Sequence, residues 1–240
     1  QETGDEIRSA VTYNNQVFDS EVTEEAPDVE GYTKVNPEET ITITTGTNEI
    51  IFYYEKVDGL TYTVEYLEKD TNKEISLPKV VDEKVYGDEV TENAIDIDGY
   101  VKVEPTSETI TIGMNENVIK FYYTKRTDLS YTVYYKELKT EKELKVAKVV
   151  NGQTYGTKVT ESAVEIEGYN KVEPTSGEVE ITTGENEITF YYTARTDLSY
   201  TVYYKEQGTE KELKVSKVVN GQTYGTKVTE EAVEIEGYNK

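Results

Sequence analysis

The chain contains a long internal repeat, and no other feature limits its fold as strongly. Thirteen residues, "VVNGQTYGTKVTE", stand at 149–161 and return unchanged at 218–230. At this shift of 69 positions, residues 127–171 and 196–240 differ at only four of 45 positions. A more diverged copy precedes them, with "YTVEY" from Tyr62 in place of "YTVYY". A fixed period of this length predicts a row of small units instead of one large domain.

The repeat also predicts where the units begin and end. The motif "FYY" closes a unit at 52, 121 and 190, and "YTVYY" or its variant opens one. We therefore expect complete repeats at 57–125 and 126–194. Residues 1–56 lack a recognisable opening, and 195–240 stop before a closing motif, so both are expected to be partial repeats. We interpret the chain as a window of a longer tandem array.

The opening and closing motifs predict β-strands. "SYTVYYKE" and "NEITFYYT" are rich in β-branched and aromatic residues and alternate with period 2. Only residues 159–166 keep a helical period for about two turns, so one short helix is the most we expect. The expected fold class is mainly β or α+β, with small repeats arranged as an elongated rod.

Two local patterns predict special backbone geometry. The pairs Asn151-Gly152 and Asn220-Gly221 are typical of tight type I′ turns, whose central residues both need positive φ. A second slot, before the closing strand, holds Gly or Asn in each copy, and we expect positive φ there too. Its members are Gly46, Asn115 and Gly184.

Comparison of the copies predicts which strand face is buried. Tyr134 in the opening strand is replaced by Glu65 in the diverged copy, whereas Tyr131, Val133 and Tyr135 keep their apolar or aromatic identity. A core position does not accept a glutamate, so Tyr134 is expected to face solvent. The same argument places five tyrosines outward: Tyr53, Tyr122, Tyr134, Tyr191 and Tyr203.

Composition excludes several function classes. The 48 acidic and 25 basic residues give a net charge of −23, which disfavours nucleic acid and anionic membranes as partners. The chain has no histidine and no cysteine, so the commonest general base and the usual zinc ligands are missing. No apolar run reaches the roughly 18 to 20 residues that span a bilayer. We expect no enzyme activity, no cofactor and no metal.

Particular residues offer three alternative chemistries. Asp96 with Asp98 or Glu104 could form a carboxylate pair for glycoside hydrolysis, although such pairs arise by chance in so acidic a chain. Acidic loops around Asp96 and Asp98 could bind calcium, but no EF-hand spacing is present. A Lys–Asn isopeptide crosslink would draw on residues that recur in every copy, namely Lys34, Lys102 and Lys171 with Asn48, Asn117 and Asn186.

The ordered motifs resemble a known family. The opening "YTVYY", the "YG" before "TKVTE", the "GY" followed by "KVEP" and the closing "NEITFYY" are similar to the mucin-binding-protein (MucBP) repeat of Gram-positive surface adhesins. The listerial-type β-grasp repeat is the nearest rival. The resemblance covers nearly the whole chain and implies a β-grasp, ubiquitin-like unit. It also implies an extracellular protein of the cell surface, with a wall anchor that this window does not contain.

Two functions follow from these expectations. In the first, the repeats bind host or environmental glycans or mucin weakly and multivalently, through the five outward tyrosines. In the second, the repeats form a structural stalk or filament-forming spacer that projects other domains. The unpaired strands of the two partial repeats would then associate head to tail, because exposed strand edges recruit partners. The alternatives for these ends are a substitute strand from residues 1–20 and fraying of 195–240.

Overall fold

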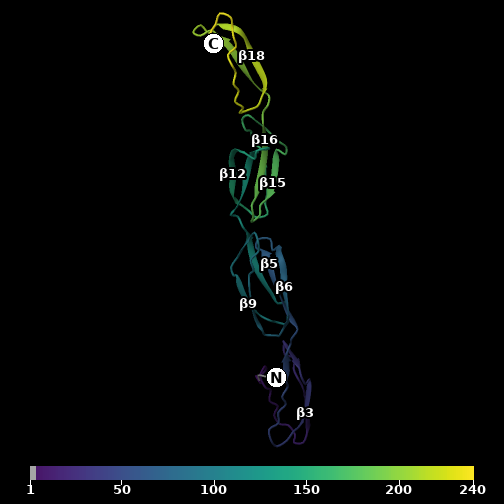
Figure 1. Cartoon of the computed structure of the whole chain (residues 1–240). Coiled ribbons are helices and arrows are strands. Elements are labelled where there is room, and N and C mark those ends of the chain that lie inside the picture. The colour runs from purple at the N-terminus through teal and green to yellow at the C-terminus, as the bar shows by residue number, and fades with distance from the viewer. Residues whose placement is uncertain (1–3) are drawn as a thin grey trace. The chain divides into compact units, whose positions relative to one another are not determined.

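The computed structural model describes residues 4–240 (Figure 1). The chain divides between Thr124 and Lys125 into two compact units, which are described separately. The described residues form strands and turns and contain no helix. The prediction of a short helix at 159–166 is therefore wrong, because Val159 lies in the strand β13 (Lys158–Ser162).

The first unit contains one complete four-stranded sheet, in the order β6-β5-β10-β8. Its strands are β5 (Leu60–Glu68), β6 (Glu74–Lys84), β8 (Tyr100–Lys102) and β10 (Val118–Lys125). The opening strand β5 and the closing strand β10 pair in parallel over six residues at the centre, and β6 pairs antiparallel with β5. The opening and closing motifs thus pair with each other at the centre of the sheet.

A second layer covers the core face of this sheet. It is the antiparallel pair of β7 (Glu89–Asn93) and β9 (Ser107–Thr111). Val90 and Ile110 from this pair pack against the core cluster, which includes Val64, Ile119 and Phe121 of the sheet. A two-stranded layer thus closes the core where a helix was expected.

The second unit repeats this plan. The sheet order is β12-β11-β16-β14, again with parallel central strands. Its strands are β11 (Leu129–Glu137), β12 (Glu143–Gln153), β14 (Tyr169–Lys171) and β16 (Glu187–Ala194), and β15 (Ser176–Glu180) pairs with β13. Tyr131, Val133 and Tyr135 are buried and Tyr134 is not. The predicted strand faces are confirmed.

Residues 4–56 and 195–240 form two-stranded sheets. In the first unit these are two antiparallel pairs, β1 (Glu21–Glu25) with β3 (Glu38–Thr42) and β2 (Tyr32–Lys34) with β4 (Tyr54–Lys56). In the second unit β17 (Leu198–Lys205) pairs with β18 (Glu212–Gln222). Residues 4–20 contain no strand. Hence β4 has no opening strand beside it, and β17 has no closing strand.

The Asn-Gly pairs do not form the predicted type I′ turns. Asn151 and Gly152 lie inside β12, where the pairing with β11 shifts by one residue. Gly152 has φ of +71°, whereas Asn151 is not among the positive-φ residues. Such a shift with a left-handed residue is a β-bulge. Glu83, at the matching site of β6, has φ of +58°, so the bulge recurs without glycine.

The predicted positive-φ slot before the closing strand is also wrong. Gly46, Asn115 and Gly184 do not appear among the residues with positive φ. The loop is instead stabilised by an asparagine side chain two residues later. In the second unit the Asn186 amide accepts hydrogen bonds from the backbone N–H and hydroxyl of Thr182, at 2.9 and 3.0 Å. This bridging lets the loop turn with ordinary φ values.

Candidate ligand-binding face

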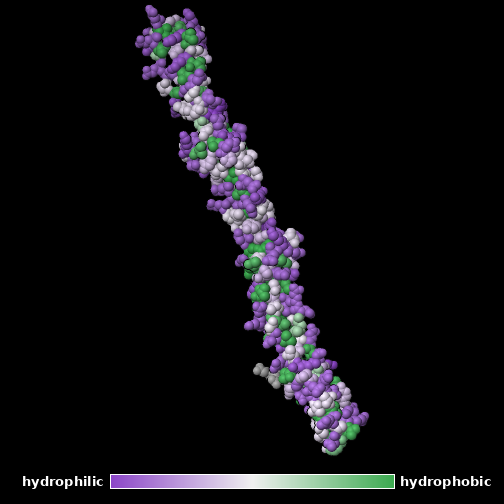
Figure 2. Space-filling view, turned by 90° about the vertical axis from the view of Figure 1, so that its right-hand side faces the viewer, coloured by the Kyte–Doolittle hydropathy of each residue, from purple (hydrophilic) through white to green (hydrophobic). Residues whose placement is uncertain are grey.

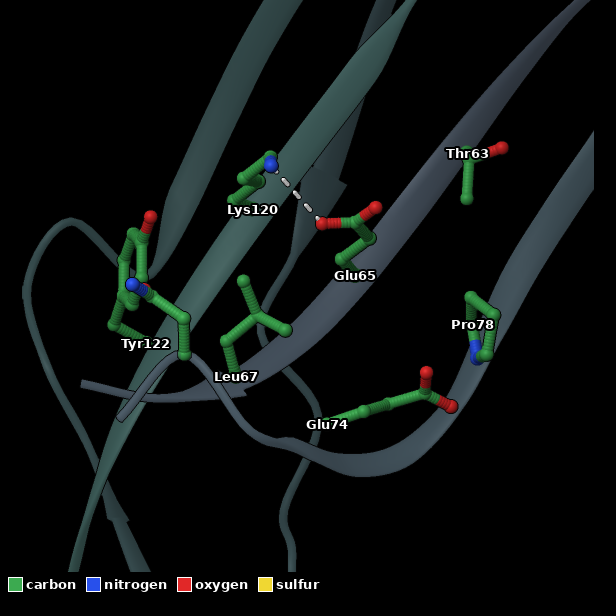
Figure 3. A pocket seen from close by; sticks show the side chains of 8 residues that line it. Thr63, Glu65, Leu67, Glu74, Pro78, Lys120 and Tyr122 are labelled. Carbon is green, nitrogen blue, oxygen red and sulfur yellow. Dashed lines mark ion pairs between the residues drawn. The ribbon is translucent and has the colours of Figure 1, made fainter. Parts of the chain in front are cut away.

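The outer face of the first complete sheet carries a shallow groove (Figure 3). Its volume is about 510 Å³. The residues that line it point away from the core and come from β5, β6, β10 and the turn before β6: Thr63, Glu65, Leu67, Asn72, Glu74, Pro78, Lys120 and Tyr122. The alternation of strand side chains puts them outside, because residues 64, 66, 119, 121 and 123 fill the core.

The groove combines apolar surface with one ion pair. Lys120 Nζ lies 3.2 Å from Glu65 Oε2, and the two residues stand opposite each other in the parallel register. The hydrogen bond that Lys120 donates to Glu65 is the main cause that raises the Lys120 pKa. In Figure 3 the Tyr122 ring stands at one side of the ion pair and Pro78 at the other, with Leu67 between Tyr122 and Glu74. A polar ligand could stack on the ring and hydrogen-bond the charged groups, with little enclosure.

The second complete sheet has two tyrosines on its outer face. Tyr134 pairs with Thr189 across the parallel strands, and Lys136 pairs with Tyr191, so the tyrosines are diagonal neighbours. The Tyr134 hydroxyl donates to Glu187 Oε1 at 3.2 Å, and Lys136 Nζ lies 5.3 Å from the Tyr134 ring centroid. The negative charge of Glu187 is the main cause that raises the Tyr134 pKa.

The remaining two candidates lie outside the four-stranded sheets. Tyr203 is 63% exposed on β17, with Lys205 Nζ 5.8 Å from its ring centroid. Tyr53 is 48% exposed, just before β4, and its backbone N–H donates to Asn36 Oδ1 at 3.2 Å. All five predicted tyrosines are thus exposed or half-buried, but the structure makes neighbours only of Tyr134 and Tyr191.

Hydrophobic surface is scattered on these units. Figure 2 shows hydrophobic side chains as small patches separated by hydrophilic ones on the face in view. Exposed single apolar residues are normal on protein surfaces. The candidate face therefore depends on individual rings and their charged neighbours, not on one broad apolar patch.

The residues considered for an isopeptide bond have separate partners. Lys102 Nζ lies 2.8 Å from Asp96 Oδ1, and Lys171 Nζ lies 2.7 Å from Glu165 Oε1. The Asn117 amide nitrogen donates to the backbone oxygens of Thr61 and Gly113, both at 3.1 Å. Asn186 makes the same contacts in the second unit and is 5% exposed. The asparagines fasten the closing loop to the opening strand.

The carboxylates considered for catalysis or calcium also have structural contacts. Asp96 forms the ion pair with Lys102, and Glu104 accepts a hydrogen bond from the Thr106 backbone at 3.1 Å. Over residues 4–240, no group of three or more acidic, His or Cys side chains is placed to hold a metal ion. The same residues include no helix long and apolar enough to span a bilayer.

Sequence reasoning missed a Tyr-Glu-Lys cluster that occurs in three repeats. In the second unit, Glu161 Oε1 lies 2.5 Å from both the Tyr131 hydroxyl and Lys148 Nζ. Both hydrogen bonds lower the pKa of Glu161, and the one from Lys148 has the larger effect. Glu92 with Tyr62 and Lys79, and Glu230 with Tyr200 and Lys217, repeat the cluster. The recurring "VTE" was the available signal.

Known proteins were compared with this chain by sequence and by structure. No family model matches, and no curated protein matches. Three solved structures, at 13 to 14% identity and TM-scores of 0.21 to 0.22, each align with 56% of this chain and 98 to 99% of their own. They are Mub-RV, a type 2 repeat of the mucus binding protein MUB from Lactobacillus reuteri, and domains 3-4 of the Streptococcal High Identity Repeats in Tandem from a cell surface protein.

Proposed function

We propose that this chain is a non-enzymatic repeat region of a bacterial cell-surface adhesin, with weak glycan sites on the outer sheet faces. The observation that carries the proposal is the outward tyrosine on each closing strand, Tyr122 and Tyr191, which stands beside charged side chains on an open face. A tyrosine ring offers an apolar surface to the C–H groups of a sugar. Lys and Glu side chains beside it can hydrogen-bond sugar hydroxyls.

The resemblance to MucBP repeats supports the same proposal. Under this proposal, residues 57–125 and 126–194 are β-grasp, ubiquitin-like units of an extracellular rod. Residues 1–56 and 195–240 are parts of such units. Each open face binds weakly, and several faces on one chain supply avidity. The net charge of −23 repels sialylated and sulfated chains. Neutral sugars of mucin or other glycans are therefore the preferred ligands.

The test is glycan binding by the full chain on an array of neutral and anionic glycans. The wild type should bind neutral glycans, and the double variant Tyr122→Ala/Tyr191→Ala should lose most of that binding. Tyr13→Ala is the matched control, because Tyr13 is 60% exposed and lies outside the sheets. Equal binding by all three chains, or none by the wild type, contradicts the proposal.

A structural spacer is the second candidate, favoured by the unpaired edges of β4 and β17. In this function the repeats project other domains, and β17 of one chain adds to the β4 edge of another, head to tail. The chain would then bind no glycan. Sedimentation of the full chain beside residues 57–194 tests the strand pairing, since only the full chain carries the unpaired edges.

A further inference from the structure

We propose that the carboxylate of Glu143 guards the edge strand β12 against pairing with a second copy of this chain, and that Glu212 does the same for β18. Each carboxylate occupies a backbone N–H that such pairing would use. The guard acts at the outer edge of the sheet, so it is independent of the glycan faces and of the β4 and β17 edges considered above.

The edge at β12 has the properties of a strand that recruits others. The strand is the first in the sheet order β12-β11-β16-β14 and pairs with β11 alone among the described elements. It is 11 residues long, whereas β14 at the opposite edge has three. Val146 and Val149 of β12 are 84% and 57% exposed. A long edge strand with exposed β-branched side chains is a template for pairing with another chain.

The backbone of Ala147 faces the open side of this edge. The Thr132 N–H donates to the backbone oxygen of Asn186, toward β16, so the backbone groups of Thr132 face away from β12. Val149 stands opposite Thr132 in the antiparallel register, and its own backbone groups therefore face away from β11. Ala147 is two residues further along the same strand. Its N–H consequently also points to the open edge.

Glu143 already binds this N–H. The Ala147 N–H donates to Glu143 Oε1 at 3.0 Å, a contact within a single strand. The register with β11 shifts by one residue between Lys148 and Lys145, which is a bulge. A bulge bends its strand, and this bend brings the carboxylate within reach of the amide. A second chain would have to displace the carboxylate before it could pair here.

The same N–H is withdrawn in every described copy of the repeat, by two different means. In β18 the Ser216 N–H donates to Glu212 Oε1 at 3.2 Å. In the most diverged copy the Ala10 N–H donates to Glu6 Oε1 at 3.0 Å. In β6 the equivalent residue is Pro78, which has no N–H to donate. Two unrelated solutions at one position point to the N–H itself as the group that must be kept from a partner.

Sedimentation velocity of the full chain over a concentration series tests the guard. The variant Glu143→Ala/Glu212→Ala frees both N–H groups and should associate about tenfold more strongly than the wild type, because each paired edge gains a hydrogen bond. Any association of the wild type through other edges is contained in the baseline. Both glutamates are exposed, so the variant is expected to fold.

Two further variants separate the N–H from the charge. Glu143→Gln/Glu212→Gln removes the charge but keeps an oxygen that accepts from the N–H, and should behave as the wild type. Adding Ala147→Pro and Ser216→Pro to the alanine variant removes the freed N–H groups, as Pro78 does in β6. This combination should return association to the wild-type level.

Hydrogen exchange of the Ala147 amide reads the guard directly. The amide should exchange about tenfold faster in the alanine variant than in the wild type, and at the wild-type rate in the glutamine variant. An unchanged rate in the alanine variant, or association no stronger than in the wild type, overturns the proposal. Equal association of the glutamine and alanine variants also overturns it, since charge would then be the cause. Proline substitutions that leave the association in place overturn it as well, because another surface would then be responsible.

Discussion

At the residue scale, tyrosine supplies much of the core, and its hydroxyls determine how the core is closed. The two closing-strand tyrosines, Tyr123 and Tyr192, are fully buried and donate to the backbone oxygens of Ile95 and Val164 at 3.0 and 2.9 Å. Burial is the main cause that raises the pKa of Tyr123 to about 12. Over residues 4–240, no buried side-chain nitrogen or oxygen lacks a partner. A core of phenol rings is thus compatible with full hydrogen bonding.

The two neighbouring tyrosines of β11 should differ sharply in their effect on stability. Tyr131→Ala removes a buried ring and the hydrogen bond to Glu161, and should lower the unfolding free energy by about 3 kcal/mol or more. Tyr134→Ala, from the outer face, should cost about 0.5 kcal/mol or less. Denaturant titration of both full-length variants measures the difference. Similar losses would show that the strand does not present these faces.

The Tyr-Glu-Lys cluster predicts a pH dependence with a definite sign. The pKa of Glu161 is lowered below its ordinary value of 4.5 in the folded chain. Its contribution is therefore present above about pH 4.5 and is lost as the pH falls through the lower folded value. Glu161→Gln should lower stability by about 1 kcal/mol at pH 7. The difference in unfolding free energy between this variant and the wild type should shrink below pH 4.5. Denaturant titrations at several pH values measure it. A difference that stays constant down to pH 2 would contradict this assignment.

Single-residue predictions from the sequence succeeded where copies could be compared. The exchange of Tyr134 for Glu65 identified the outer face, because only an exposed site accepts both side chains. The role of Glu161 could not be identified in this way, because Glu recurs there in every copy and most glutamates in this chain are exposed. Its partner Tyr131 is 30 residues away in sequence, and only the folded second layer brings them together.

At the scale of elements, the loop before the closing strand depends on one asparagine. Asn186 Nδ2 donates to the Ser130 oxygen at 3.0 Å and also bridges Thr182 and Gly184. The parallel pairing of β11 and β16 begins beside this contact, since the Thr132 N–H donates to the backbone oxygen of Asn186 at 2.9 Å. The asparagine therefore fixes the register of the two central strands.

Asn186→Ala should destabilise its sheet by about 1 to 3 kcal/mol, because buried backbone groups lose their partners. Asn48→Ala is the matched control. Asn48 makes the loop contacts to Thr44 and Gly46, but among the described residues no opening strand pairs beside it. Asn48→Ala should therefore cost less stability than Asn186→Ala. Hydrogen exchange of the backbone amides in each loop measures the two losses. Equal loss of protection in both variants would count against the bridging role.

The strands were predictable because their side chains alternate in polarity. The helix prediction for residues 159–166 failed because its pattern was short. Val159, Ala163 and Ile166 have helical spacing, and all three contact the core. In the structure, Val159 reaches the core from β13, whereas Ala163 and Ile166 follow the end of that strand. The Ala163 N–H pairs with the Thr175 oxygen at 2.8 Å instead of with a helical neighbour. Over eight residues, periodicity alone does not distinguish a short helix from a strand followed by a loop.

At the scale of the molecule, a tyrosine ring packs on a Gly-Tyr corner inside each unit. In the second unit the Tyr224 ring lies edge-on to Tyr169, with centroids 5.6 Å apart. This joint should control how the segments that carry the two tyrosines are oriented. Gly168→Ala would place a Cβ 2.3 Å from the Tyr224 ring and should displace that ring. Gly152→Ala is the control, because Gly152 also has positive φ but open space around it. Nuclear magnetic resonance shifts of the Tyr224 ring protons should change only in the first variant. An unchanged Tyr224 in Gly168→Ala would contradict the joint.

Sequence alone could predict the row of units, but not the ring-on-glycine contact that fastens them, because glycine and tyrosine occur throughout the chain.

The parallel pairing of the first and last strands has a mechanical consequence. Tension along the chain enters a repeat at the start of β11 and leaves it at the end of β16, and these points lie at opposite ends of the same ladder. From Thr132 with Glu187 to Glu137 with Tyr192, the six register pairs are loaded in shear and must break nearly together. An antiparallel pair pulled from one end would instead unzip one bond at a time. Resistance to pulling is a matter of unfolding rate and not of equilibrium stability. Under tension, such repeats should therefore hold for as long as this ladder of six pairs stays intact, whatever their stability at equilibrium.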